Sequence, residues 1–189
     1  YKTPWCIISI VWPLLFVFAA GIVLLEEKVR IVGRVVAVAA LVVSLGLCVR
    51  LNFLRFTTDT EPYVYVQTYE DINKLTEPLL SLARRNPTYY QLVGHMIRQS
   101  AYPLPWVLGD FPKIGYYEKE ALPSPMDADF LLVQEDKVEA VESKLKGAYY
   151  TMPITIRPYQ DTSKLYLSAR VFKDFFQGRV PDFVGKGSG

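Results

Sequence analysis

The stretch that decides the fold is residues 5–25, WCIISIVWPLLFVFAAGIVLL, which contains no charged side chain. A helix needs about 20 apolar residues to cross the hydrocarbon core of a bilayer, because hydrocarbon cannot satisfy free backbone N–H and C=O groups. Residues 5–25 meet that length. The sequence therefore predicts a first transmembrane helix here.

A second apolar stretch follows directly after the polar segment EEKVR at residues 26–30. It reaches membrane-spanning length over residues 31–50 if Arg34 and Arg50 extend their charged groups toward the two membrane surfaces. So short a connection makes the two spans antiparallel. We therefore predict a transmembrane helical hairpin over residues 1–55, with the lipid bilayer and other transmembrane helices or membrane subunits as its partners.

A cleaved signal peptide is the main alternative to the first span. The chain does not begin with Met and a basic segment, and no small-residue cleavage site leads into soluble sequence. The missing Met also suggests a piece of a longer protein. The positive-inside rule does not decide the orientation, because three basic residues fall on each side, Lys2, Arg50 and Arg55 on one and Lys28, Arg30 and Arg34 on the other.

Residues 56–180 have the composition of a soluble domain, with slightly more acidic than basic side chains, so a nucleic-acid partner has no electrostatic support. Strands alternate with helices and a strand hairpin follows, which predicts a small α/β domain with a mixed sheet. The expected strands are residues 62–68, 91–97, 113–118, 129–134, 149–159 and 165–171. The expected helices are residues 68–85, capped by Thr68, and 135–147. A short helix or turn is expected over residues 102–112, and a short aromatic-faced helix is expected around Phe172, Phe175 and Phe176. Residues 181–189 are expected to form a flexible tail.

No spacing of residues in the chain assembles a catalytic site, and we predict no cofactor and no metal site. His95 lies in an apolar strand, where we favour a structural role. Asp127 and Asp129 are interpreted as solvated loop acids rather than a proton-sharing pair. Cys6 and Cys48, at similar depth in the hairpin, are interpreted as buried thiols, although a disulfide between them is geometrically feasible.

The most distinctive local segment is PLPWVLGDF at residues 103–111, in which two prolines fix the backbone around Trp106. Asp110 is expected to close the turn. One interpretation is a sugar-binding platform with Trp106 and Asp110 as binding residues. The other, which we favour from the residues alone, is that Trp106 and Phe111 cover the edge of the sheet. The many tyrosines of the domain suit either a sugar-binding surface or a face that lies on a membrane.

The order of three segments resembles a known family. YKTPW at residues 1–5 before the two spans, then PYVYVQT at 62–68 and PLPWVLGDF, resemble the C-terminal region of family 39 glycosyltransferase-like proteins, the polytopic GT-C enzymes related to protein mannosyltransferases. The resemblance touches both ends of the hairpin and the first half of the domain, and it ends at about Ala121. It implies an extracytoplasmic (periplasmic) soluble domain and an enzyme that uses a polyprenyl-phosphate sugar, with its catalytic acid upstream of Tyr1. Within this chain it implies only that Lys2 touches a lipid phosphate.

Two functions remain open from the sequence. The first is a non-catalytic membrane anchor and extracytoplasmic domain of such a glycosyltransferase, with a glycan or polyprenyl-phosphate sugar as its ligand. The second is a non-enzymatic accessory subunit of a larger membrane complex, for example an energy-transducing or photosynthetic assembly. A helical hairpin with small-residue faces and a compact domain suits the second role, since small residues let helices pack closely in lipid.

Overall fold

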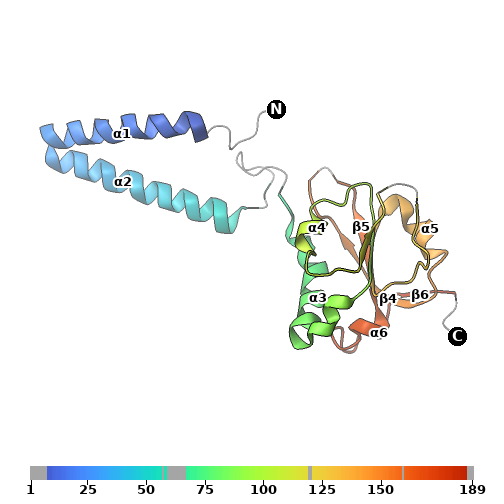
Figure 1. Cartoon of the computed structure of the whole chain (residues 1–189). Helices are drawn as coiled ribbons and strands as arrows, with labels where there is room; N and C mark the ends of the chain where they lie inside the picture. Colours follow the sequence, from blue (N-terminus) through green and yellow to red (C-terminus); the bar gives the residue numbers. More distant parts are fainter. Residues whose placement is uncertain (1–7, 57, 59–66, 119–120, 159, 187–189) are drawn as a thin grey trace. The chain divides into compact units, whose positions relative to one another are not determined.

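The computed structural model describes residues 8–56, 58, 67–118, 121–158 and 160–186. The chain divides into two compact units, residues 1–67 and 68–189, which we call the hairpin and the head and describe separately (Figure 1). The strand expected over residues 62–68 falls mostly outside the described residues, and Gln67 and Thr68 belong to no strand.

The hairpin consists of α1 (Ile8–Lys28) and α2 (Arg30–Val49), joined at Val29, with a π-helical turn (Arg50–Leu54) after α2. The helices have 21 and 20 residues, which at 1.5 Å per residue gives each about the thickness of a bilayer core. Both are apolar enough to span a membrane, as the sequence predicts. The polar connection is shorter than expected, because α1 continues through residues 26–28.

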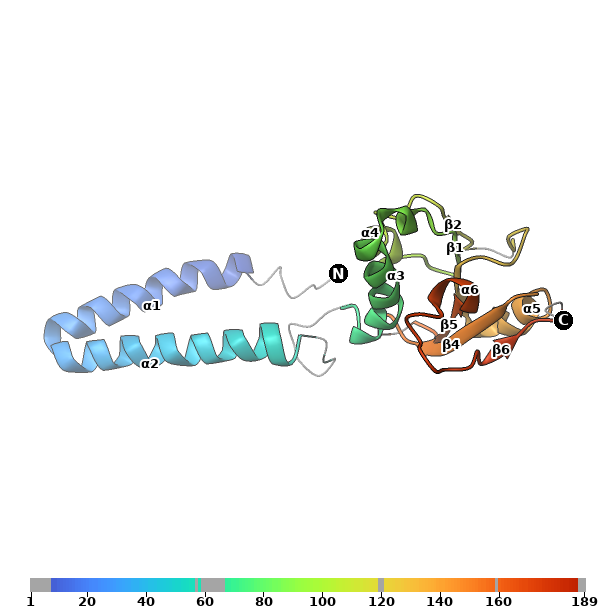
Figure 2. The same ribbon diagram turned by 90° about the horizontal axis from the view of Figure 1, so that it is seen from below.

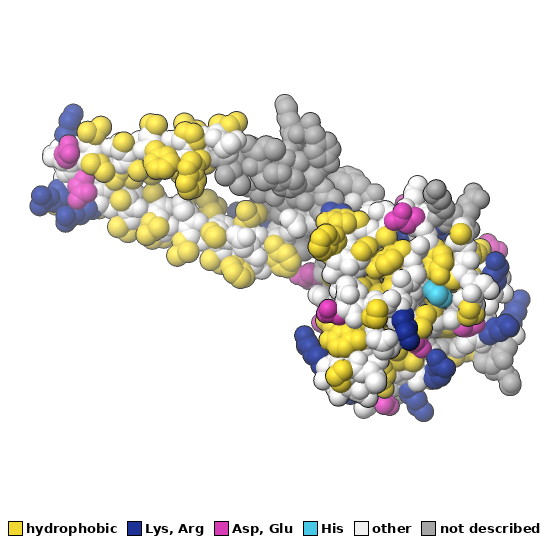
Figure 3. Space-filling view, viewed as in Figure 1, with side chains coloured by type: hydrophobic (Ala, Val, Ile, Leu, Met, Phe, Trp, Pro, Cys, Tyr) yellow, Lys and Arg dark blue, Asp and Glu magenta, His cyan; other side chains and the backbone are white. Residues whose placement is uncertain are grey.

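The two helices of the hairpin meet closely near their connection. Gly33 is the buried residue of α2, and a Cβ placed there would lie 2.6 Å from the Cα of Glu26. Beside this contact, Arg34 Nε donates to Glu26 Oε1 at 2.9 Å. Figure 3 shows hydrophobic side chains along both helices and charged side chains gathered at this tip. Glycine at position 33 therefore permits the tight approach of the two backbones.

Away from the tip, the side chains of the hairpin are mostly exposed. Gly21 and Gly46 have no atom of another segment near the position of a Cβ, so these small residues do not pair α1 with α2. Cys48 is an exposed free thiol rather than a buried one, because no described segment covers this part of α2. Cys6, and with it the disulfide question, lies outside the described residues.

The head is built on one mixed sheet of six strands in the order β2-β1-β3-β5-β4-β6. β1 runs parallel to β2 and β3, and the β3–β5, β5–β4 and β4–β6 pairs are antiparallel. The predicted mixed α/β sheet is thus confirmed. The strand bounds are β1 Gly94–Ile97, β2 Ile114–Tyr116, β3 Phe130–Gln134, β4 Ala148–Ile154, β5 Ser163–Ser168 and β6 Phe183–Val184.

Helices cover both faces of the sheet. One face carries α3 (Asn73–Arg85), α4 (Leu104–Val107) and α6 (Ala169–Phe172), and the other carries α5 (Val138–Glu142) (Figure 2). α3 buries Leu75, Leu79 and Leu82 at the predicted helical spacing. Every residue of β3 is buried, because alternate side chains enter the two hydrophobic cores.

Several predicted boundaries of the head are corrected. The strands expected over 91–97 and 149–159 are limited to Gly94–Ile97 and Ala148–Ile154, and the segment 102–112 is helical only over Leu104–Val107. The first helix begins with a 3-10 turn at Glu70, and the Thr68 side chain does not cap it. Asp71 in this turn accepts a hydrogen bond from the backbone N–H of Thr155 at 3.1 Å. α5 ends at Glu142 rather than at 147. β5 ends at Ser168, because α6 begins at the next residue.

The predicted flexible tail is wrong at Phe183 and Val184. These residues form β6, which pairs with the first residues of β4. The ring of Phe183 lies 6.5 Å from that of Tyr149 and 6.1 Å from that of Tyr166, measured between ring centroids. Aromatic packing against the sheet thus extends the head beyond its predicted end at residue 180.

Candidate functional site

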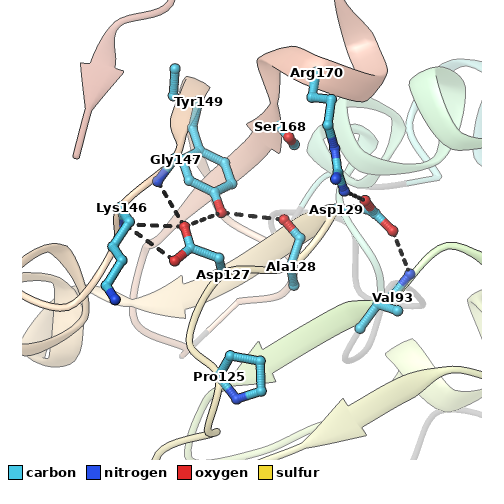
Figure 4. A pocket seen from close by; sticks show the side chains of 11 residues that line it. Val93, Pro125, Asp127, Ala128, Asp129, Lys146, Gly147, Tyr149, Ser168 and Arg170 are labelled. Atoms are coloured by element: carbon cyan, nitrogen blue, oxygen red, sulfur yellow. Dashed lines mark hydrogen bonds and ion pairs between the residues drawn. The ribbon is translucent and has the colours of Figure 1, made fainter. Parts of the chain in front are cut away.

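A pocket that includes four charged side chains lies at one edge of the sheet, where β1 and β3 begin and β5 ends (Figure 4). Its volume is about 580 Å³, which is within the range of small-ligand sites. Four segments line it: Val93 before β1, Pro125 and residues 127–129 before β3, residues 146–149 at the start of β4, and Ser168 and Arg170 at the end of β5 and just after it.

Asp127 anchors one wall of the pocket. Its Oδ1 accepts hydrogen bonds from the backbone N–H of Gly147 at 2.8 Å, the backbone N–H of Lys146 at 3.1 Å and the hydroxyl of Tyr149 at 2.9 Å (Figure 4). Burial raises the pKa of Tyr149, and the bond to the Asp127 carboxylate raises it further, so the phenol stays protonated and donates. The carboxylate therefore fixes the loop before β3 against the start of β4.

Asp129 anchors the opposite wall. Its Oδ2 accepts from the backbone N–H of Val93 at 2.9 Å, and its Oδ1 accepts from Arg170 Nη2 at 3.0 Å. Its backbone carbonyl accepts from the N–H of Ser168 at 2.9 Å. Asp129, directly before β3, thus joins the start of β1 to the end of β5. The Arg170 side chain remains 84% exposed, so most of its guanidinium stays available to a ligand.

The charges of the pocket balance. Two carboxylates (Asp127 and Asp129) face two cationic side chains (Lys146 and Arg170). Lys146 is exposed, and within the described chain its ammonium has no hydrogen-bond partner. The pocket therefore offers both acceptors and donors without a net charge, which suits a neutral polar ligand better than a strongly charged one.

The opposite edge of the sheet, at the carboxyl ends of β1 and β3, is closed by buried polar groups. Arg98, 3% exposed, directly follows β1 and donates to Ser163 Oγ at 2.9 Å and to Gln160 Oε1 at 3.0 Å. Burial lowers its pKa, and the nearby charge of Asp161 opposes that shift. Gln134, the last residue of β3, donates through its side-chain amide to Asp161 Oδ2 at 2.8 Å. Ligands of open α/β sheets often bind at the carboxyl ends of parallel strands, but here internal hydrogen bonds occupy that position.

α4 presents Trp106 to solvent, also at this second edge. Trp106 is 82% exposed, whereas Leu104 and Leu108 on either side of it are 0% and 2% exposed and hold the turn onto the core. Phe111 is buried against Tyr90 and Phe130. The interpretation we favoured from the sequence is therefore right for Phe111 and wrong for Trp106, because Leu104 and Leu108 take the buried positions of the turn.

The structure does not bring the predicted binding residues into the pocket. Trp106 and Asp110 lie near the other edge of the sheet, and Lys2 lies outside the described residues. Asp110 is exposed and has no hydrogen bond within the described chain; the turn is closed instead by the N–H of Phe111 donating to the carbonyl of Leu108 at 2.9 Å.

Sequence reasoning missed the pocket. The sequence pattern indicates Asp127 and Asp129 as a pair of solvated acids, and it does not single out the cations Lys146 and Arg170. The available signal was polar residues placed directly at the ends of three predicted strands. His95 is 8% exposed in β1, and burial lowers its pKa, so it is held neutral. Among the described residues, no group of His, Cys, Asp and Glu side chains could hold a metal ion.

The fold and site together define a two-helix hairpin of membrane-spanning length followed by a mixed-sheet α/β head with a polar pocket. Comparisons with protein-family models, with curated proteins and with solved structures find no match to this chain.

Proposed function

We propose that the hairpin crosses a bilayer and that the chain is the non-catalytic membrane anchor and extracytoplasmic domain of a polyprenyl-phosphate-sugar-dependent glycosyltransferase. In this proposal the head binds a carbohydrate in the polar pocket. Three features support it: the two apolar helices, the resemblance of residues 1–5, 62–68 and 103–111 to GT-C proteins, and the balanced donors and acceptors of the pocket. The resemblance also implies the extracytoplasmic side.

The chemistry of the pocket suits vicinal hydroxyl groups, which donate and accept hydrogen bonds at once. Asp127 and Asp129 have further lone pairs for a hydroxyl donor, and Lys146 and Arg170 supply donors to the hydroxyl oxygens. Because backbone and Tyr149 hydrogen bonds hold both carboxylates in place, a ligand loses little free energy in ordering them. The observation that carries the proposal is this pair of anchored carboxylates beside the Lys146 ammonium, which has no hydrogen-bond partner among the described residues.

The test is a glycan-binding screen on the full chain in lipid nanodiscs. A neutral oligosaccharide should bind and perturb the NMR signals of residues 127–129 and 146–149. Lys146→Gln should weaken that binding about tenfold, the loss expected for one hydrogen bond to a charged group. Lys144→Gln, which changes an exposed lysine outside the pocket, should leave it unchanged. Equal weakening by both variants, or binding unaffected by Lys146→Gln, would contradict the proposed site.

A second candidate function is an accessory subunit of a larger membrane complex. The favouring observation is that the small residues Gly21 and Gly46 touch no other segment of the described chain, which leaves room for helices of another protein to pack there. Intact-mass measurement of the native protein separates the two functions. A mass near 21.6 kDa with stoichiometric partners indicates a subunit, and a much larger mass indicates the tail of a polytopic enzyme.

A further inference from the structure

A surface of apolar and aromatic side chains projects from α4. Tyr102, Trp106 and Val107 are 52%, 82% and 40% exposed, and Pro105 between them is exposed as well. The guanidinium carbon of Arg157 lies 4.7 Å from the centroid of the Tyr102 ring, which places a positive charge at the rim of this surface. We call these five residues the α4 patch.

The chain enters the head at the same edge. The backbone N–H of Tyr69 donates to the carbonyl of Ile156 at 2.8 Å, so this contact near the start of the head lies one residue from Arg157. β4 points in the same direction as β1 and β3, and therefore Arg157 after β4 and α4 after β1 both lie beyond the carboxyl ends of these strands. Both views of the ribbon draw α4 on the same side of the sheet as α3, the first long helix of the head (Figures 1 and 2).

The connection to the hairpin is short. The chain from Leu54 to Thr68 spans at most about 50 Å when fully extended. A tether of this length holds the head at a local concentration of about a millimolar relative to the surface that anchors the hairpin, so weak surface contacts are enough to orient it.

We propose that the α4 patch rests on the bilayer surface and orients the head, an inference that relies on the proposed insertion of the hairpin. Trp and Tyr rings favour the interface of a bilayer, where an apolar ring meets lipid and its polar group meets water. Arg157 adds a cation that attracts anionic lipid headgroups. The neighbours of Trp106 along the turn, Pro105 and Val107, lack side-chain hydrogen-bonding groups, so they suit lipid better than the hydroxyls of a sugar.

This orientation has a consequence for the pocket. The pocket opens at the amino ends of β1 and β3, whereas the α4 patch lies beyond their carboxyl ends. With the patch on the membrane, the pocket faces away from the lipid. Its ligand would then approach from the aqueous phase rather than from within the bilayer.

Fluorescence of single-tryptophan variants tests the inference in the full chain. The protein has three tryptophans, so Trp5→Phe with Trp12→Phe leaves Trp106 alone. In nanodiscs, Trp106 emission should be blue-shifted, and lipids brominated near the headgroup should remove about half of its intensity. In discs that contain anionic lipid, Arg157→Gln should reduce the quenching. Lys113→Gln, at the opposite edge before β2, should not.

Each contrary outcome has its own meaning. Solvent-like emission without bromine quenching overturns the inference, and blue-shifted emission without quenching overturns it in favour of a protein contact. A response of Trp106 to soluble oligosaccharide in place of lipid overturns it in favour of a sugar platform. The variant that keeps only Trp12, within α1, reports hairpin insertion separately. Quenching of Trp12 without quenching of Trp106 refutes the α4 patch alone, whereas loss of both refutes the membrane anchor itself.

Discussion

The strongest single prediction concerns Asp127, whose carboxylate joins the loop before β3 to the start of β4. Asp127→Ala removes the acceptor of two backbone N–H groups and of the Tyr149 hydroxyl. The backbone groups of Lys146 and Gly147 are near solvent, so water replaces much of each bond and the loss is about 0.5–1 kcal/mol apiece.

The Tyr149 hydroxyl loses more of its bonding than these two amides. The residue is 2% exposed, and its remaining acceptor is the carbonyl of Ala128 at 3.3 Å. Leaving this hydroxyl poorly satisfied costs about 1 kcal/mol. We therefore expect Asp127→Ala to lower the free energy of unfolding of the head by about 2–3 kcal/mol, and Asp127→Asn, which keeps Oδ1, to lower it by less.

A double-mutant cycle measures the key hydrogen bond directly. Hydrogen exchange of the central amides in β3 and β5, with the chain in nanodiscs, reports global opening of the head. Tyr149→Phe alone should cost about 1 kcal/mol, and the double variant Asp127→Ala with Tyr149→Phe should cost about 1 kcal/mol less than the sum of the single changes. If the two effects add, the Asp127–Tyr149 bond contributes no stability and the reasoning is refuted.

Three further predictions concern packing, pH and the hairpin. Gly94→Ala forces a Cβ into the Phe130 ring and should destabilise the head by about 1–3 kcal/mol in the same exchange assay; an unchanged stability would mean that the ring moves freely. Burial acts to raise the pKa of Glu142. The hydrogen bonds from Lys164 and Tyr166, together with the charge of Lys164, outweigh burial and leave the pKa lowered. Because the folded-state pKa is the lower one, this stabilisation is present above pH 4.5 and is lost as the pH falls through the folded-state value, so Glu142→Gln should flatten the acid side of a urea-unfolding series. Gly33→Leu places a side chain against the α1 backbone and should separate the helices, seen as altered migration of the hairpin in detergent gels; Gly46→Leu should migrate unchanged.

The elements that could be predicted are those whose signal is local. Alternation and apolar run length identified β3, and a repeat of leucines at helical spacing identified α3, because a residue's burial in these elements follows from its immediate neighbours. Boundaries failed where a distant contact decided them. β6 forms because Phe183 packs on aromatic rings of β4 and β5, and no pattern in the residues around Phe183 predicts this contact.

The site depended on such distant contacts throughout. Asp129 and Arg170 are 41 residues apart in the chain, and Arg98 and Ser163 are 65 apart, so neither pairing has a local signal. The exposure of Trp106 was likewise settled by which side chains of its turn reached the core. A proline-framed turn fixes the backbone of residues 103–107, but it does not determine which side chain points outward.

The sequence by itself determined the hairpin and the class of the head. Two long uncharged stretches are unfavourable in water, and helices that cross a membrane can bury both of them. The periodicity that distinguishes strands from helices is a property of neighbouring residues, so the sequence alone shows it. Only the tertiary structure decided where the polar groups go. It placed two carboxylates and two cations around one pocket at the amino ends of β1 and β3, and an exposed tryptophan at the other edge, because strand order and chain crossing bring together residues that the sequence keeps far apart.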